Sequence, residues 1–210
     1  TRPCAPRSDA VPAGLTRVNF LAHFHLAWPD EDLIAGGLEG DYYKGPLGND
    51  LPAPLARGVR LHRAIDAYTD AHPRIATLRA ELPAQLRRFS GILIDLSFDH
   101  FLYKHWADFS EVPRRDFNKA VYRTLQARED QLSDSSRRML ARLVQHDILD
   151  LYGDWSTVTA TAERIGERFR RDNPFIGIEQ TLSPYRANLE RAFLDFYPEL
   201  QAHCACRISR

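Results

Sequence analysis

The sequence predicts an all-α fold, built as a single compact domain of seven to nine helices. Two observations favour this class. Most of the chain divides into amphipathic or apolar helical segments, and no stretch alternates apolar and polar residues over the length of a strand. β-Branched residues, which are typical of strands, are sparse. With 210 residues, the chain is long enough to bury one sizeable hydrophobic core.

Proline and capping residues divide the chain into candidate helices. Pro29 closes a short apolar segment, and Asp30 is a good N-cap for the helix that follows. Pro73 ends a later helix, and Pro83 suits the first turn of a long one. The expected helices span residues 18–28, 30–43, 55–70, 73–81, 83–108, 115–130, 133–152, 155–171 and 183–203, with a loop rich in glycine and proline at 45–54.

The two ends of the chain differ from the helical domain, which we expect at residues 17–203. Residues 1–16 are rich in proline without an apolar core, so they predict a flexible leader and not a secretory signal. Residues 204–210 are expected to form a tail. The three cysteines lie near the termini, which favours a reducing compartment over a disulfide framework. No run is long enough for a transmembrane helix, so we expect a cytoplasmic protein without a membrane partner.

The charge of the chain is balanced overall but uneven locally. Hydrophobic residues make up 44% and charged residues 27%, with a formal net charge of zero, so nothing in the whole chain favours nucleic acid or an anionic membrane as a partner. Arginines nevertheless cluster in the middle of the chain and could attract an acidic partner, or simply form solvated helix faces. These are Arg57, Arg60, Arg63, Arg74, Arg87 and Arg88.

Two segments each carry a pair of metal-ligand side chains four residues apart. The pairs are His62 with Asp66 and Asp95 with Asp99. On helices, each pair lies on one face and about one turn apart, and both faces are apolar and should be buried. Carboxylate and imidazole together suit Zn, Mn or Fe, and a cation with an open coordination position activates water. The alternative is a buried aspartate that caps a loop or pairs with arginine.

Further polar residues lie near these pairs in the sequence. His23 and His25 are two residues apart in an apolar segment, so at most one of them faces a given site if the segment is helical. Asp41 lies at an expected helix end, where the helix dipole disfavours a negative charge. We therefore expect a compensating partner for it, which is a cation or else Lys44 or Arg63. Arg63 could also bind a phosphate at the edge of the site.

Several other chemistries are disfavoured. The chain contains no glycine-rich nucleotide loop, no Gly-x-Ser-x-Gly elbow and no cysteine near the candidate ligands, so covalent acyl chemistry is not expected. A di-iron oxygenase would use paired Glu and Glu-x-x-His motifs, whereas this chain offers Asp and His. A helical binding module without catalytic activity remains an alternative, and it predicts no bound metal.

As an ordered set, several segments between about Val18 and Tyr197 resemble the acyl carrier protein phosphodiesterases. They are Asn19-Phe-Leu-Ala-His23-Phe-His25-Leu-Ala, Gly40-Asp41, Leu61-His62-Arg63-Ala-Ile-Asp66 with Thr69-Asp70, Asp95, Asp99-His100-Phe-Leu, His105-Trp106 and Phe193-Leu-Asp-Phe-Tyr197-Pro198. The resemblance implies a manganese-dependent, all-helical branch of the HD-type metal-dependent phosphohydrolases. It also implies an activity in fatty acid and lipid metabolism, the hydrolysis of holo-acyl carrier protein to the apo form and 4′-phosphopantetheine.

The resemblance further implies roles for individual residues. The implied metal ligands are His23, Asp41, His62, Asp66, Asp95 and Asp99. Catalytic roles fall to Asp66 and Asp99, which could orient or deprotonate water, and to Arg63 and Lys44, which could stabilise developing charge. His100, Asp70 and His25 are expected around the ligands. The order Asp99-His100 reverses the His-Asp pair that names the wider superfamily, so the ligand list of that superfamily does not transfer directly.

The resemblance also implies a cofactor and a partner. The cofactor would be a divalent metal, for which the resemblance favours Mn²⁺, with Mg²⁺, Fe²⁺ or Zn²⁺ as alternatives. The partner would be acyl carrier protein, a small acidic helical bundle, which would give the arginines a purpose in docking. A metal-dependent phosphohydrolase of the same build that acts on a small-molecule phosphoester or nucleotide is the alternative function.

Overall fold

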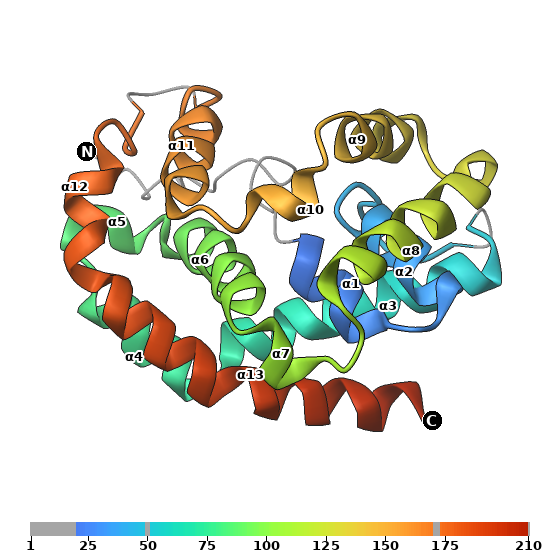
Figure 1. Cartoon of the computed structure of the whole chain (residues 1–210), viewed down its shortest axis with the longest axis horizontal. Coiled ribbons are helices and arrows are strands. Elements are labelled where there is room, and N and C mark those ends of the chain that lie inside the picture. The colour runs from blue at the N-terminus through green and yellow to red at the C-terminus, as the bar shows by residue number, and fades with distance from the viewer. Residues whose placement is uncertain (1–19, 49–50, 170–172, 210) are drawn as a thin grey trace, which may run out of the picture.

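A computed structural model gives the structure of the chain and describes residues 20–48, 51–169 and 173–209. Over these residues the chain forms helices and turns without a strand, which confirms the predicted all-α class (Figure 1). The helices of eight or more residues are α1 Phe20–Ala27, α2 Glu31–Gly40, α3 Ala53–Ala71, α4 Pro73–Glu81, α6 Ser90–Lys104, α8 Arg114–Ala127, α9 Asp134–Gln145, α11 Trp155–Gly166 and α13 Arg186–Ile208. Shorter helices are α5 Ala84–Arg87, α7 Trp106–Phe109, α10 Ile148–Leu151, α12 Ile178–Leu182 and the 3-10 turns η1 Glu129–Gln131 and η2 Ser183–Tyr185.

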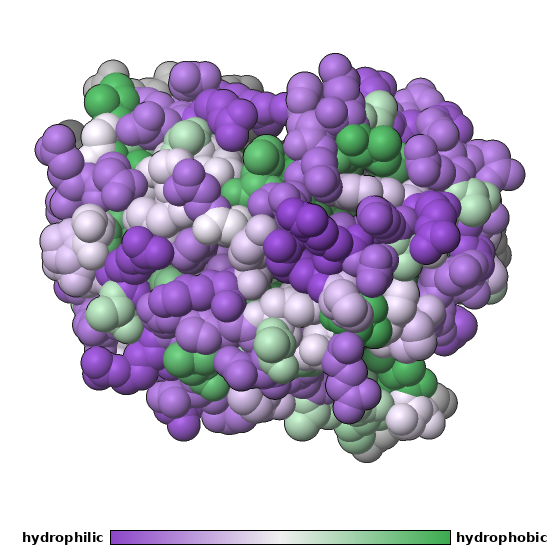
Figure 2. Space-filling view, in the orientation of Figure 1, coloured by the Kyte–Doolittle hydropathy of each residue, from purple (hydrophilic) through white to green (hydrophobic). Residues whose placement is uncertain are grey.

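Helix α6 lies at the centre of the hydrophobic core. Its side chains are buried on nearly every face, because α1, α11 and α13 all pack against it. Aromatic rings fill the contact with α13, where Phe98 meets Phe193 edge to face at a centroid distance of 5.4 Å. Figure 1 shows α13 running along one edge of the domain with α4 beside it. The outer face in Figure 2 is mostly hydrophilic, with small scattered hydrophobic patches, as expected around one buried core.

The closest helix contact joins α2 to α3. A Cβ atom added to Gly36 would lie 2.4 Å from the Leu55 carbonyl oxygen and 2.5 Å from the Cα atom of Gly58. Only glycine allows the two backbones to approach this closely. The predicted N-cap of α2 is confirmed, since the Asp30 side chain accepts hydrogen bonds from the backbone N–H groups of residues 32 and 33. The close packing fixes the end of α2 beside the middle of α3.

The predicted long helix at residues 83–108 is wrong, because the chain there forms α5, α6 and α7. The backbone leaves helical geometry at Phe89, with φ −110° and ψ 8°, and at His105, with φ −102° and ψ 24°. Phe89 stacks on Phe169 at a centroid distance of 5.3 Å, so packing with a distant segment accompanies the first break. The predicted helix at 133–152 is also divided, into α9 and α10, at Asp147, which has a φ of 44°.

The last helix extends beyond its predicted end. Helix α13 runs to Ile208, so the expected boundary after residue 203 falls inside the helix. Cys204 is buried in the core, whereas Cys206 is exposed, and both are free thiols. The predicted leader at residues 1–16 lies outside the described residues. In the part of the chain that the structure describes, no helix is both long and apolar enough to cross a membrane.

Candidate metal centre

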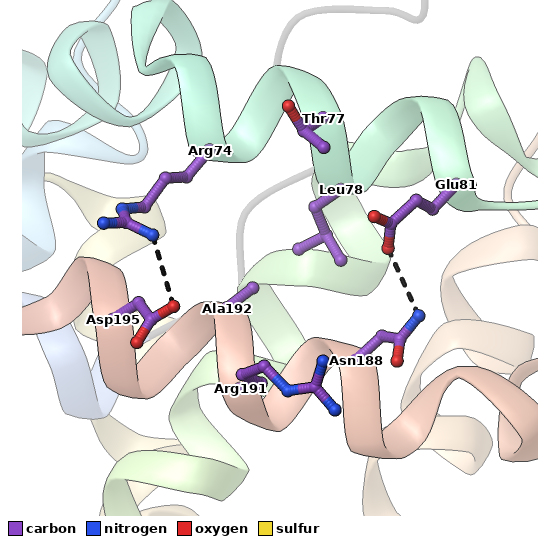
Figure 3. Close-up of a pocket in the computed structure, with 8 residues that line it drawn as sticks. All are labelled: Arg74, Thr77, Leu78, Glu81, Asn188, Arg191, Ala192 and Asp195. Atoms are coloured by element: carbon purple, nitrogen blue, oxygen red, sulfur yellow. Dashed lines mark hydrogen bonds and ion pairs between the residues drawn. The ribbon is translucent and has the colours of Figure 1, made fainter.

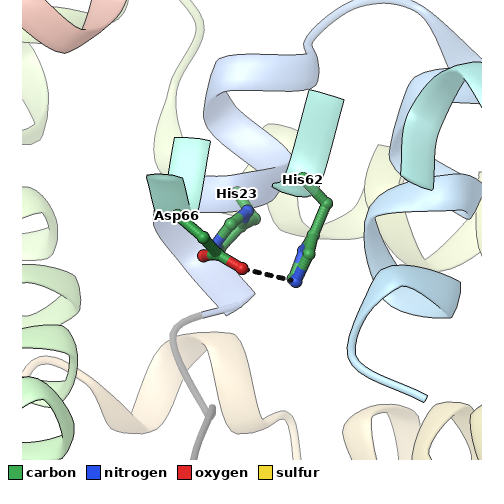
Figure 4. Close-up of side chains that lie close together, drawn as sticks. All are labelled: His23, His62 and Asp66. Atoms are coloured by element: carbon green, nitrogen blue, oxygen red, sulfur yellow. Dashed lines mark ion pairs between the residues drawn. The ribbon is translucent and has the colours of Figure 1, made fainter. Parts of the chain in front are cut away.

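His23, His62 and Asp66 converge between α1 and α3 (Figure 4). One potential ligand atom of each lies within 4.8 Å of the other two. The Asp66 carboxylate bridges the two imidazoles, with Oδ1 3.4 Å from His23 Nε2 and Oδ2 3.3 Å from His62 Nε2. The two histidine rings stack, with centroids 4.2 Å apart. We call these three residues the metal cluster.

The cluster combines two buried imidazoles with one carboxylate that reaches solvent. The His23 and His62 side chains are 3% and 2% exposed, whereas Asp66 is 17% exposed. Gly40 makes room for the His62 ring, because a Cβ atom at that position would lie 2.5 Å from its Cγ atom. Imidazole nitrogen and carboxylate oxygen are suitable ligands for divalent Mn, Fe or Zn. The donor set therefore fits a divalent transition metal.

Asp41 lies at the edge of the cluster, directly after α2. Its Oδ1 atom is 3.8 Å from His62 Nε2, so it is within reach of the same point. The two basic residues predicted near the site brace this segment. Lys44 Nζ donates to the Asp41 carbonyl oxygen at 2.6 Å, and the Arg63 guanidinium donates to the Tyr43 carbonyl oxygen at 2.9 Å. The Arg63 contact holds the chain that carries Asp41 against α3, whereas the Lys44 contact closes a local turn.

Asp99 lies outside the converging group, and its carboxylate contacts the start of α1. Its two carboxylate oxygens accept the backbone N–H groups of Leu21 at 3.1 Å and Ala22 at 2.9 Å. These groups belong to the first turn of α1, where N–H donors have no partner within the helix. Burial raises the pKa of Asp99 well above its usual value. Asp99 thus takes the capping role that the sequence left as an alternative, at the start of the helix that carries His23.

Asp95 and Asp70 lie beside the cluster and are not part of the converging group. Together with Asp66 they line a narrow cavity of about 30 Å³, to which α13 contributes Tyr197. Asp70 forms an ion pair with Arg79 at 2.6 Å. The predicted pair of Asp95 and Asp99 is therefore divided. Asp95 shares this cavity with Asp66 of the cluster, whereas Asp99 points toward α1.

The other two predicted histidines lie outside the metal cluster, with His100 buried and His25 partly buried. His25 Nδ1 lies 2.8 Å from the Tyr197 hydroxyl, and burial lowers the pKa of His25 to about 4. His100 Nδ1 donates to the Tyr152 carbonyl oxygen at 2.8 Å, and its Nε2 accepts from Arg186 at 3.2 Å, since a guanidinium can only donate. Burial also lowers the pKa of His100. The structure thus places His23 in the cluster and His25 on the far side of α1.

The structure adds residues that the sequence reasoning did not assign to the site. Gly40 leaves space for the His62 ring. Its position directly before Asp41 is the one feature of the sequence that could have indicated a role in the site. Tyr152 packs beside Asp99, where burial and the nearby carboxylate raise its pKa well above the usual value. No sequence pattern pointed to Tyr152, because its contact with α6 joins segments that are far apart in the chain.

A comparison with protein families identifies relatives of the chain. The family model described as acyl carrier protein phosphodiesterase matches residues 18–200. The chain belongs to the acyl carrier protein phosphodiesterase family. A relative of that name from Escherichia coli O157:H7 (strain EC4115) is 29% identical over 195 residues, which cover 90% of this chain and 98% of the relative. One from Klebsiella pneumoniae is 30% identical over 187 residues, covering 87% and 95%. No solved structure matches the chain.

In this family member, the predicted arginine cluster is dispersed over the surface. Arg57 and Arg60 line a groove with Ala64 on the side of α3 that faces away from the metal cluster, as their helical spacing requires. Arg57 also pairs with Asp30 at 3.0 Å. Arg74 lies in the groove between α4 and α13, where it pairs with Asp195 at 3.2 Å (Figure 3). These three arginines therefore do not gather around the metal cluster.

Proposed function

We propose that this chain is a metal-dependent phosphodiesterase that releases 4′-phosphopantetheine from holo-acyl carrier protein. The observation that carries the proposal is the convergence of His23, His62 and Asp66 in a chain of this family. The relatives' name supports the substrate, and the cluster supports a metal-assisted hydrolysis. We place the activity in the cytoplasm, because the cysteine usage favours a reducing compartment.

The metal cluster would hold the cation, with Asp41 within reach as a further ligand. The expected ion is Mn²⁺, with Mg²⁺, Fe²⁺ and Zn²⁺ as alternatives for the same donors. The chemistry that such a cation supplies when bound is Lewis acidity, which offsets charge on phosphoryl oxygens and lowers the pKa of water. We also propose that the fold is that of a branch of the HD-type metal-dependent phosphohydrolases.

The partly exposed carboxylate of Asp66 is placed to handle the attacking water. It lies where solvent meets the cluster, so it can orient a water molecule and accept its proton, and Asp95 faces the same cavity from α6. The water oxygen forms a bond to phosphorus while the bond from phosphorus to the serine oxygen of the carrier breaks. The serine oxygen takes up a proton, so the products are apo-carrier and 4′-phosphopantetheine.

Arg63 is the proposed contact to the phosphodiester. One of its N–H groups donates to the Tyr43 carbonyl oxygen, and the guanidinium has five N–H groups in all. A guanidinium held at the edge of the cluster can donate charge-assisted hydrogen bonds to phosphate oxygens. Lys44 brings a second positive charge to the same segment, through its contact with the Asp41 backbone.

The test is to incubate the protein with holo-carrier protein and Mn²⁺ and to follow the carrier by mass spectrometry. We expect the carrier to lose its prosthetic group, and we expect the loss to stop when a chelator is added. Asp66→Asn should abolish release, because it removes the carboxylate that joins the two imidazoles. Asp195→Asn is the matched control, since Asp195 is exposed on α13 and pairs with Arg74.

The alternative function is hydrolysis of a small-molecule phosphoester or nucleotide at the same cluster. It predicts that the carrier keeps its prosthetic group while a nucleotide or simple phosphodiester is hydrolysed in a metal-dependent way. A chain that binds no Mn²⁺ and hydrolyses neither substrate would contradict both functions and favour the binding module.

A further inference from the structure

A groove between α8 and α10 shares no residue with the metal cluster, and the proposed function gives it no role. Its volume is about 400 Å³, within the range of about 300–1,000 Å³ that is typical of small-molecule sites. Helices α8, α9 and α10 pack against one another around it (Figure 1). The polar lining consists of Arg115, Asn118, Lys119 and Tyr122 from α8, with Asp147 and Asp150 on the opposite wall.

Asn118 lies at the floor of this groove with a buried acceptor that is unpaired. The residue is only 4% exposed, and no donor from the described residues reaches its Oδ1 atom. Nearly all buried polar groups in folded proteins have a hydrogen-bond partner, because an unpaired one is costly. Since Asn118 lines the groove, a molecule bound there can supply the missing donor.

Two cationic side chains stand on the α8 side of the groove. Arg115 and Lys119 are four residues apart, so they lie on one face of the helix about one turn apart. Both are exposed, and in the part of the chain that the structure describes neither side chain forms an ion pair, whereas their neighbour Arg114 pairs with Asp150. Two adjacent cations suit a doubly charged phosphate monoester better than a singly charged carboxylate, and a guanidinium binds phosphate oxygens in pairs.

The opposite wall of the groove is held in place by contacts within the chain. The Tyr122 hydroxyl donates to Asp147 Oδ1 at 2.9 Å and accepts the Leu149 backbone N–H at 3.0 Å. These contacts hold the turn at Asp147, whose backbone is left-handed with a φ of 44°. Both carboxylates of this wall already accept donors of the chain, since Asp150 pairs with Arg114. The groove is therefore preformed, and its uncompensated charge is positive.

We propose that this groove binds a small phosphate monoester that also carries a hydroxyl or amide donor. The phosphate lies against Arg115 and Lys119, and the donor reaches Asn118 Oδ1. The inference does not depend on the reaction proposed for the metal cluster, because the two sites share no residue. Binding is measurable without an activity assay, by calorimetry or by the stability that a ligand of the native state adds.

The first test compares four small molecules by isothermal titration of the full chain. We expect hydroxyethyl phosphate to bind saturably, with one molecule per chain. Ethyl phosphate lacks only the hydroxyl and should bind at least about fivefold more weakly, because it leaves Asn118 Oδ1 unpaired. Hydroxypropionate, which has a carboxylate in place of the phosphate, should bind at least about tenfold more weakly. Ethylene glycol, which has no anionic group, should not bind.

The second test changes the lining of the groove. Arg115→Gln and Lys119→Gln should each raise the Kd for hydroxyethyl phosphate about ten- to hundredfold. Arg123→Gln is the matched control, because Arg123 is exposed on the same helix but does not line the groove. Asn118→Leu replaces the unpaired amide by an apolar group of similar volume. It should therefore raise the Kd at least about fivefold without lowering the melting temperature.

The outcomes separate a ligand site from a structural groove. The proposal is overturned if the wild type does not bind hydroxyethyl phosphate, or if Arg123→Gln weakens binding as much as Arg115→Gln. Binding that disappears in Asp66→Asn would place the ligand at the metal cluster instead. A lower melting temperature of Asn118→Leu with an unchanged Kd would make Asn118 a structural residue. If that variant does not fold, Arg115→Gln and Lys119→Gln still decide the proposal, because they change exposed side chains.

Discussion

The imidazole rings of His23 and His62 stack with centroids 4.2 Å apart and planes 25° apart, although they belong to different helices. Both rings turn an Nε2 atom toward the Asp66 carboxylate. Two features hold this arrangement. Asp99 caps the start of α1, and Gly40 has no side chain that would displace the His62 ring. The predictions below separate residues that form the cluster from residues that position it.

His23→Ala should lose Mn²⁺, whereas His25→Ala should keep it. Loss of residues around a metal ligand lowers affinity about 10- to 100-fold, so loss of the ligand itself should cost at least as much. His25 instead contacts the Tyr197 hydroxyl, and its removal should lower the free energy of unfolding by about 1–3 kcal/mol. Metal per folded chain and urea midpoints measure the two effects. Greater metal loss from His25→Ala would overturn the assignment.

Gly40→Ala should displace His62 and weaken Mn²⁺ binding. The new Cβ atom would lie 2.5 Å from the ring, and relieving such overpacking costs about 1–3 kcal/mol of stability. Gly37→Ala, in the same helix, is the control, because its Cβ atom would meet Phe24 at 4.0 Å, an ordinary contact. That change should preserve metal binding and stabilise α2 by up to about 1 kcal/mol. Equal metal affinity in the two variants would show that His62 does not need the space.

Asp99→Asn should destabilise the fold more than it affects metal binding. An amide places an N–H₂ group where Leu21 or Ala22 also offers an N–H, so about 1–3 kcal/mol of stability should be lost. Below the unfolding temperature and at saturating Mn²⁺, the variant should bind as much metal as the wild type. An unchanged melting temperature combined with loss of metal would instead make Asp99 a ligand.

Cys206 should react with iodoacetamide at pH 8 in the native protein, whereas Cys204 should not. Burial raises the pKa of the Cys204 thiol to about 12, so almost none of it is thiolate at pH 8, and its sulfur is also enclosed. Peptide mapping by mass spectrometry after a short exposure gives the extent at each position. Rapid labelling of Cys204 would show that the last turns of α13 are not packed on the domain, as the predicted tail requires.

The sequence by itself determined the helical class, the N-cap at Asp30 and two of the three residues of the metal cluster. His62 and Asp66 are four residues apart, and a helix brings such a pair onto one face whatever the rest of the fold does. The sequence also indicated the family, because the family's motifs follow one another in order along residues 18–200.

Only the tertiary structure decided which residues complete the site. Asp95 and Asp99 have the same four-residue spacing as His62 and Asp66. Helix α6 is buried on nearly every face, however, so the spacing does not predict which neighbouring helix each aspartate contacts. The start of α1 needs a hydrogen-bond acceptor, and Asp99 is the buried carboxylate that meets it.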